Sequence, residues 1–129
     1  MPIEIQMLTC SVALLFVLII IQAASGAMQI GLVKALGNRE DAPSLTGFAG
    51  RAKRTVMNML ENMMMFAPLV LAGIAIQHTN QWSALGAQVF LYARVGHAAT
   101  YLIGIPVIRA LFYGAGLVGT GLVFYSFYV

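Results

Sequence analysis

Four polar residues at helical spacing lie at the edge of an apolar stretch and are the first candidates for chemistry. Within GFAGRAKRTVMNMLEN they follow one another at steps of three, four and three, as Arg51, Arg54, Asn58 and Glu61. That spacing places them on one face of a helix. The sequence that follows, MMMFAPLVLAGIAI, is apolar almost without interruption. Because polar and charged side chains are costly inside a membrane, the four residues are predicted to have a partner or a ligand.

A second polar set has the same kind of spacing further along the chain. Arg94, His97 and Tyr101 share one face of a predicted helix. Arg109 and Tyr113 follow in the first two turns of the next predicted helix. No comparable set of polar residues is expected in the other half of the membrane.

Helix geometry places the two sets at similar depth. At a rise of roughly 1.5 Å per residue, Glu61 lies about 10 Å, Arg94 about 15 Å and Tyr101 about 5 Å from the same membrane surface. The two sets can therefore meet in one half of a helical bundle. An unpaired buried carboxylate or guanidinium is strongly unfavourable, so we expect Glu61 and Arg94 to form a structural ion pair.

This ion pair leaves a surplus of arginine. The chain has seven Lys and Arg residues against four Asp and Glu residues, and Glu61 is the one acid in the predicted site. Arg51, Arg54 and Arg109 therefore remain without enough acidic partners. A planar guanidinium binds a carboxylate at two points, so the surplus predicts an anionic ligand.

Other kinds of site find little support in the residues. His78 and His97 lie toward opposite ends of the predicted bundle and Cys10 is the single cysteine, so we expect no metal site and no intrachain disulfide. Cys10 lies in an apolar run and is interpreted as a small packing residue. His97 is interpreted either as a hydrogen-bonded structural residue or as a ligand contact. The sequence has no serine-nucleophile motif and no phosphate-binding glycine loop.

Transmembrane helices are the elements that must position these residues. Hydrophobic residues make up 60% of the 129 residues and charged residues 9%, and the mean hydropathy is +0.88, far from the balance of a soluble domain. Four continuous apolar stretches are near the roughly 20 residues that a bilayer core requires, whereas a transmembrane barrel would show alternating segments. We predict one all-α domain over residues 1–129, an integral membrane four-helix bundle with helices at about 5–36, 46–78, 84–105 and 107–129.

The first predicted helix is expected to remain in the mature protein. Small residues at positions 23–27 follow its apolar run and are compatible with a cleaved signal peptide. The start MPIEIQ has no basic residue, however, and the apolar run continues beyond any cleavage point. Both features favour a membrane span.

The basic residues predict the orientation in the membrane. Five of the seven lie between Lys34 and Arg54, the second loop has none, and Arg109 lies at the third junction. Since Lys and Arg collect in cytoplasmic loops, we expect the first and third loops in the cytoplasm and both termini on the opposite side. This topology also accounts for the net charge of +3, and no basic face with interleaved aromatic residues predicts a nucleic-acid partner.

These residues resemble the MAPEG family, the membrane-associated proteins in eicosanoid and glutathione metabolism. The resemblance rests on GRAKRTVMNMLEN at residues 50–62, RVGHAATY at residues 94–101 and PVIRALFY at residues 106–113, and GNREDAP is similar to bacterial members. It covers nearly the whole chain. It implies a multi-pass protein of the bacterial inner membrane that assembles as a homotrimer and binds glutathione between neighbouring subunits.

The resemblance also implies an activity and a role for each matching residue. Glutathione would be the thiol co-substrate of a microsomal-type transferase or peroxidase that acts on small hydrophobic electrophiles entering from the lipid bilayer. Arg109 would be the catalytic residue that stabilises the glutathione thiolate. The implied glutathione contacts are Arg54, Asn58, Glu61, His97, Tyr101 and Tyr113.

Two departures and two alternatives limit this interpretation. Members with defined eicosanoid activities carry basic residues toward the end of their first helix, where this chain has Lys34, and some have serine where this chain has Ala110. No eicosanoid isomerase reaction is therefore assigned. The alternatives are a small four-helix proton-coupled transporter that uses Glu61, and a catalytically inactive MAPEG-like membrane protein.

Overall fold

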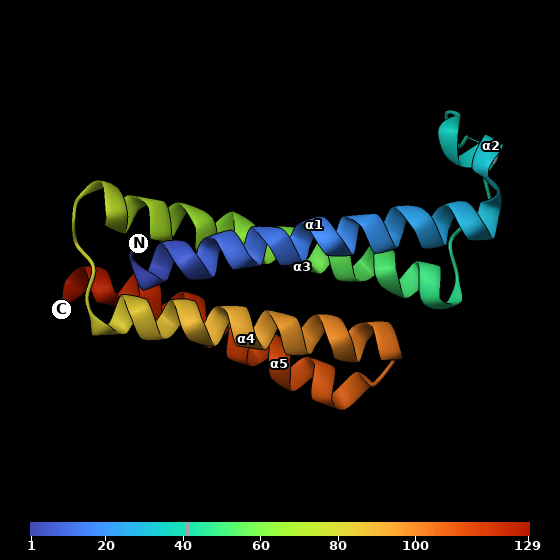
Figure 1. The fold of residues 1–129 in the computed structure, drawn as a ribbon. Helices are drawn as coiled ribbons and strands as arrows, with labels where there is room; N and C mark the ends of the chain where they lie inside the picture. The colour runs from blue at the N-terminus through green and yellow to red at the C-terminus, as the bar shows by residue number, and fades with distance from the viewer. Residues whose placement is uncertain (41) are drawn as a thin grey trace.

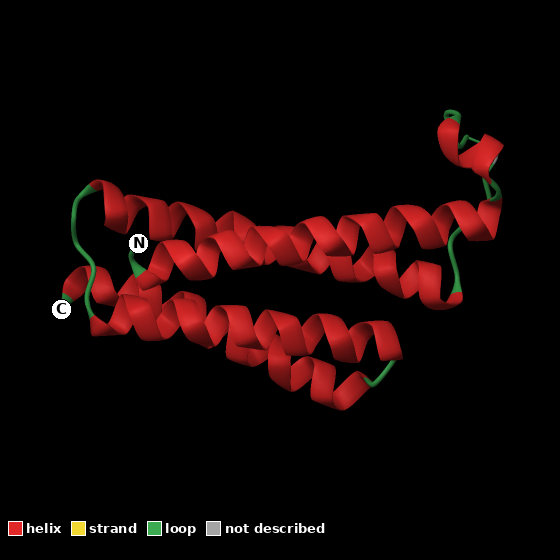
Figure 2. Ribbon diagram, viewed as in Figure 1, coloured by secondary structure: helices red, strands yellow, loops and turns green. Residues whose placement is uncertain are grey.

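The structure is a computed structural model, and it describes residues 1–40 and 42–129. The described chain is helical throughout and contains no strand (Figure 2). Its elements are α1 (Ile3–Ile30), α2 (Leu32–Leu36), α3 (Gly47–Ala75), α4 (Gln81–Ile103), α5 (Pro106–Tyr125) and a terminal 3-10 turn, η1 (Ser126–Tyr128).

The four long helices run alongside one another, with both chain termini at the same end (Figure 1). α1 packs along α3, α4 packs along α5, and both α1 and α3 also contact α4. The opposite end carries the C-terminus of α1, the N-terminus of α3 and the turn between α4 and α5. The polar residues of α3, α4 and α5 lie toward this second end.

The first predicted helix is corrected by a break at Gly31. The sequence predicted one helix over about 5–36, but α1 ends at Ile30 and the short α2 begins at Leu32. Gly31 has φ of 90° and ψ of 147°, a conformation that glycine adopts without a steric penalty. The chain therefore turns away from the axis of α1, and α2 projects from the end of the molecule (Figure 1).

Among the residues that the structure describes, three helical segments are long and apolar enough to cross a membrane, judged by length and composition. They are α1, α3 and the segment Pro106–Tyr128, which consists of α5 and η1. The expectation of four apolar spans is therefore met by these three segments but not by α4, which is 23 residues long and does not meet this criterion. The reason is composition, since α4 includes Gln88, Arg94 and His97, and the last two are 1% and 2% exposed inside the chain.

Close packing of aromatic and small residues holds the helices together. Phe66 of α3 stacks on Phe90 of α4 with ring centroids 3.8 Å apart, and both are fully buried. A Cβ atom on Gly86 would lie 2.6 Å from the carbonyl oxygen of Gly119, so these two glycines let the α4 and α5 backbones touch. This contact sets the positions of α4 and α5 relative to each other.

A cluster of hydrogen bonds, here called the terminal clasp, joins the chain termini to the start of α4. Asn80 caps α4 through a capping box with Ser83, and its amide also donates to the carbonyl of Ser126 at 3.0 Å. His78 Nε2 lies 2.9 Å from the same carbonyl. The hydroxyl of Ser83 is hydrogen-bonded to the carboxylate of Glu4, which is 5% exposed. The N-terminus, the turn before α4 and the C-terminus are therefore held together.

Candidate functional site

A cavity at the opposite end from the terminal clasp collects polar side chains from three helices. It has a volume of about 310 Å³. One of its lining residues comes from α3, two come from α4 and three come from α5: Asn58, His97, Tyr101, Arg109, Ala110 and Tyr113. Five of these were candidates from the sequence, and the structure places them around one space.

The α3 wall of the cavity is held in place by a buried arginine. Arg94 of α4 is 1% exposed, and its Nη2 donates to Asn58 Oδ1 at 2.6 Å. The amide of Asn62, itself 1% exposed, donates to the backbone carbonyl of Asn58 at 2.8 Å. A charge-assisted hydrogen bond is stronger than one between neutral groups, so Arg94 fixes the orientation of the half-buried Asn58 side chain.

The arginine also orients the histidine in the floor of the cavity. Nη2 of Arg94 lies 3.3 Å from Nδ1 of His97. Because a guanidinium can only donate, Nδ1 accepts, and a neutral His97 then carries its proton on Nε2. The His97 ring lies 5.4 Å from the ring of Tyr101 and 6.2 Å from that of Tyr113. The position of His97 is compatible with both a structural and a ligand-binding role, since its ring is hydrogen-bonded and also lines the cavity.

Two arginines gather around Tyr101 at the mouth of the cavity. Nε of Arg54 donates to the Tyr101 hydroxyl at 3.1 Å. The guanidinium carbon of Arg109 lies 4.4 Å from the centre of the Tyr101 ring, which is the geometry of a cation–π contact. Two positive charges beside one tyrosine repel each other, and an anion bound between them would reduce that repulsion.

The start of α5 adds further positive character beside Arg109. α5 begins at Pro106, so Arg109 lies in its first turn or just after it. Ile105 precedes the helix and has no side-chain acceptor for the first backbone N–H groups. A helix N-terminus carries a partial positive charge, which acts in the same direction as the guanidinium.

The predicted pair of Glu61 with Arg94 is corrected. The hydrogen bonds of Arg94 go to Asn58 and His97, while the side chain of Glu61 is exposed on the surface of the chain. The spacing along α3 accounts for this result, because Asn58 lies one turn before Glu61 and directly faces α4. Glu61 therefore does not line the cavity in this single chain.

Arg51 has a structural position. Its Nε donates to the backbone carbonyl of Leu102 at 3.1 Å, in the last turn of α4. The guanidinium also lies against Gly104, which ends α4 in a left-handed conformation. A cation at a helix C-terminus is favourable, so Arg51 joins α3 to the end of α4.

Asn62 is a buried polar residue near the cavity that sequence reasoning missed. It follows Glu61 directly, so it was not part of the predicted stripe. Asn62 Oδ1 has no hydrogen-bond partner in the described structure, and the same is true of Arg94 Nε and Nη1 and of Thr120 Oγ1. The useful signal was an amide in an otherwise apolar run, one turn after Asn58. Arg94 therefore retains two donors that protein groups do not satisfy.

The side chains around the cavity include one guanidinium, one imidazole and two phenol groups, from Arg109, His97, Tyr101 and Tyr113. Its cations and hydroxyl groups suit a carboxylate or a thiolate. Within residues 1–40 and 42–129, no three His, Cys, Asp or Glu side chains gather in positions that could hold a metal ion.

The comparisons with known proteins give the family of the chain. A family model described as the MAPEG family matches residues 7–128, nearly the whole chain. No curated protein and no solved structure gave a significant match. The three apolar helical segments and the family match together identify an integral membrane protein. The chain belongs to the MAPEG family.

Proposed function

We propose that this protein is a membrane-bound glutathione transferase or peroxidase that acts on small hydrophobic electrophiles. One observation carries the proposal: Asn58, His97, Tyr101, Arg109 and Tyr113 line one cavity. These residues come from sequence positions up to 55 apart, and each matches the family motif. Membership in a family of glutathione and eicosanoid metabolism supports the same ligand.

The chemistry of glutathione suits the side chains around the cavity. The tripeptide has two carboxylates, one amine and one thiol. Arg54 lies at the mouth beside Tyr101 and can take a carboxylate at two points. The amide of Asn58, held by Arg94, can recognise a peptide group.

Arg109 is proposed to lower the pKa of the glutathione thiol. A free thiol has a pKa of about 8.5 and is mostly protonated at neutral pH, and a nearby cation favours the thiolate. Arg109 combines its own charge with the N-terminus of α5. The thiolate sulfur then attacks the electrophilic carbon, the new carbon–sulfur bond forms, and the leaving group departs with the bonding electrons. The hydrophobic electrophile would reach the sulfur from the bilayer.

The assembly and orientation are proposed together with this function. We propose that α4 crosses the membrane with the three apolar segments, as the fourth helix of a single four-helix domain, and that three chains form a homotrimer. Glu61, exposed in the single chain, would then face a neighbouring subunit and bind the amine of glutathione there. The end that carries Arg54 and Arg109 would face the cytoplasm of a bacterial cell, with both termini across the inner membrane.

The direct test measures the thiolate of bound glutathione in the detergent-solubilised protein. Its ultraviolet absorbance is followed against pH, and we expect the protein to shift the titration to lower pH. Arg109→Ala should abolish the shift, Arg109→Lys should keep part of it, and Arg39→Ala, which removes an arginine away from this cavity, should leave it intact. If the protein does not bind glutathione at millimolar concentration, the proposal is refuted.

The same measurement separates the alternatives. A catalytically inactive family member would show neither a shifted thiol titration nor stabilisation by glutathione. A proton-coupled transporter would use Glu61, and its proton flux in liposomes would disappear in Glu61→Gln. The exposure of Glu61 outside the cavity gives that alternative no specific support.

A further inference from the structure

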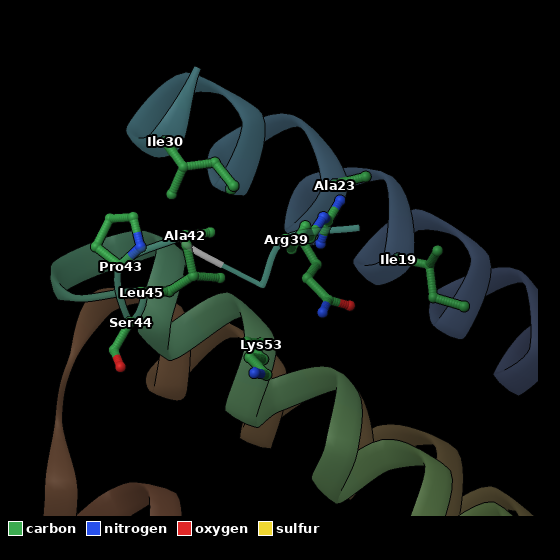
Figure 3. A pocket seen from close by; sticks show the side chains of 11 residues that line it. Ile19, Ala23, Ile30, Arg39, Ala42, Pro43, Ser44, Leu45 and Lys53 are labelled. Atoms are coloured by element: carbon green, nitrogen blue, oxygen red, sulfur yellow. The ribbon is translucent and has the colours of Figure 1, made fainter. Parts of the chain in front are cut away.

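A second cavity lies between the C-terminal half of α1 and the segment that leads to α3. Its volume is about 410 Å³, and Figure 3 shows the side chains around it. It is formed by α1, Arg39, residues 42–45 and Lys53 of α3. None of these residues lines the candidate glutathione site, so this cavity is separate from it.

One wall of the second cavity is apolar and belongs to α1. Ile19, Ala23, Gly26 and Ile30 follow one another at steps of four, three and four, which places them on one face of the helix. Leu45 covers this face at Gly26, where an added Cβ would lie 3.7 Å from Leu45 Cδ1. From Ile19 to Ile30 the wall extends roughly 17 Å along the helix.

A further part of the second cavity's lining carries two cations. Arg39 comes from the segment before α3 and Lys53 from α3 itself, and Figure 3 shows both beside the same hollow. The other polar side chains lining the cavity, among the residues that the structure describes, are the neutral Gln22 and Ser44. This part of the lining therefore suits a negatively charged group.

The position of Arg39 is determined by its backbone. Its φ is 62°, in the left-handed region that residues other than glycine rarely adopt. Its Nε donates to the carbonyl of Ala35 at 2.9 Å, which ties the side chain to the end of α2. The side chain is therefore directed by the local structure.

We infer that this cavity binds the anionic headgroup of a membrane phospholipid, with an acyl chain along the α1 wall. A soluble phosphate would need the cations but not an apolar wall of this length. A neutral lipid would need the wall but not the cations. Basic pockets beside transmembrane helices recognise acidic headgroups, and a guanidinium binds phosphate oxygens at two points. The cavity combines the two features at the end of an apolar helix.

Thermal stabilisation of the full chain in neutral detergent tests this inference. The added probes are phosphatidylglycerol, phosphatidylcholine with the same acyl chains, and glycerol phosphate without chains. We expect phosphatidylglycerol to stabilise the protein most. Arg39→Gln combined with Lys53→Gln should weaken its apparent affinity by about tenfold or more. Lys34→Gln removes a positive charge nearby that does not line this cavity, and should leave the affinity unchanged.

A second variant keeps the test decisive if the charge variant does not fold. Ala23→Phe fills the apolar wall and leaves both cations in place, so it should weaken phosphatidylglycerol binding without changing the net charge. Equal stabilisation by phosphatidylcholine, or equal loss in Lys34→Gln, would overturn the inference. Stabilisation by glycerol phosphate as strong as that by the lipid would also overturn it, since it would identify a site for soluble phosphate esters.

Discussion

The terminal clasp and the cavity region lie at opposite ends of the helices. They differ in how completely their polar groups are hydrogen-bonded. In the terminal clasp, the Glu4 carboxylate, the Ser83 hydroxyl and the Asn80 amide each have hydrogen-bond partners. In the cavity region, Arg94 and Asn62 are equally buried but keep atoms without partners. An unsatisfied buried polar group costs about 1–3 kcal/mol. The named groups of the clasp are therefore satisfied by protein hydrogen bonds, whereas Arg94 and Asn62 carry part of this cost.

The largest effect that this comparison predicts is at Arg109. Arg109→Ala should lower the rate of glutathione conjugation by about 10²–10³-fold, the usual loss when one group that stabilises a reacting anion is removed. Its side chain is half-buried beside Tyr101, so the unfolding temperature should change little. Conjugation rate and thermal unfolding, measured on the same preparation, check both parts. A large fall in the unfolding temperature would contradict this prediction, because it would mean that Arg109 stabilises the fold as the clasp residues do.

The clasp should show the reverse pattern. Ser83→Ala removes the hydroxyl that binds Glu4 and that completes the capping box of α4, so it should lower the free energy of unfolding by about 1–3 kcal/mol. Glutathione affinity should stay within twofold of the original. Unfolding by denaturant in mixed micelles and calorimetric titration with glutathione give the two values. Exposed Thr79→Ala, in the same turn, is the matched control and should have no effect.

Arg94 sharpens the comparison because it is buried and yet incompletely satisfied. Arg94→Met removes a buried charge with two unpaired nitrogens, and such replacements are often neutral or stabilising. The same change frees Asn58, so glutathione should bind about tenfold more weakly, equivalent to about 1.4 kcal/mol. Calorimetric titration and thermal unfolding measure the two effects. A loss of several kcal/mol in stability would place Arg94 with the clasp.

The smallest predicted effect concerns one hydroxyl at the mouth of the cavity. Tyr101→Phe removes the group that accepts from Arg54 but keeps the ring beneath Arg109. One neutral acceptor is worth about 1 kcal/mol, so glutathione affinity should fall about fivefold or less. Titration of the variant gives this value. An unchanged affinity would show that Arg54 does not need Tyr101 for its position.

Helical spacing predicted much of the cavity but not its internal partners. The steps of three and four placed Arg94, His97 and Tyr101 on one face, and the structure has all three on one side of α4. The predicted partner of Arg94 was wrong, since Arg94 donates a hydrogen bond to Asn58 and not to Glu61. Spacing determines which residues of one helix share a face. It does not determine how far a neighbouring helix is rotated about its own axis.

The apolar runs likewise predicted which segments are helical but not every point where a helix ends. The continuous apolar runs predicted α1, α3 and α5, but the helix break at Gly31 was missed because a single glycine in an apolar run permits either a helix or a turn. The clasp was missed as well. Glu4 and Ser83 are 79 positions apart, and neither carries a local signal that the other is its partner.

The sequence by itself determined the membrane class, the family and the two polar stripes, because these depend on composition and on periodicity within one segment. The tertiary structure decided the rest. It brought Asn58 to Arg94, left Glu61 on the surface and joined Glu4 to Ser83. The physical reason is close packing: the contact of Gly86 with Gly119 and the stacking of Phe66 on Phe90 set the distance and rotation of the helices. Those two quantities select the partner of each polar side chain.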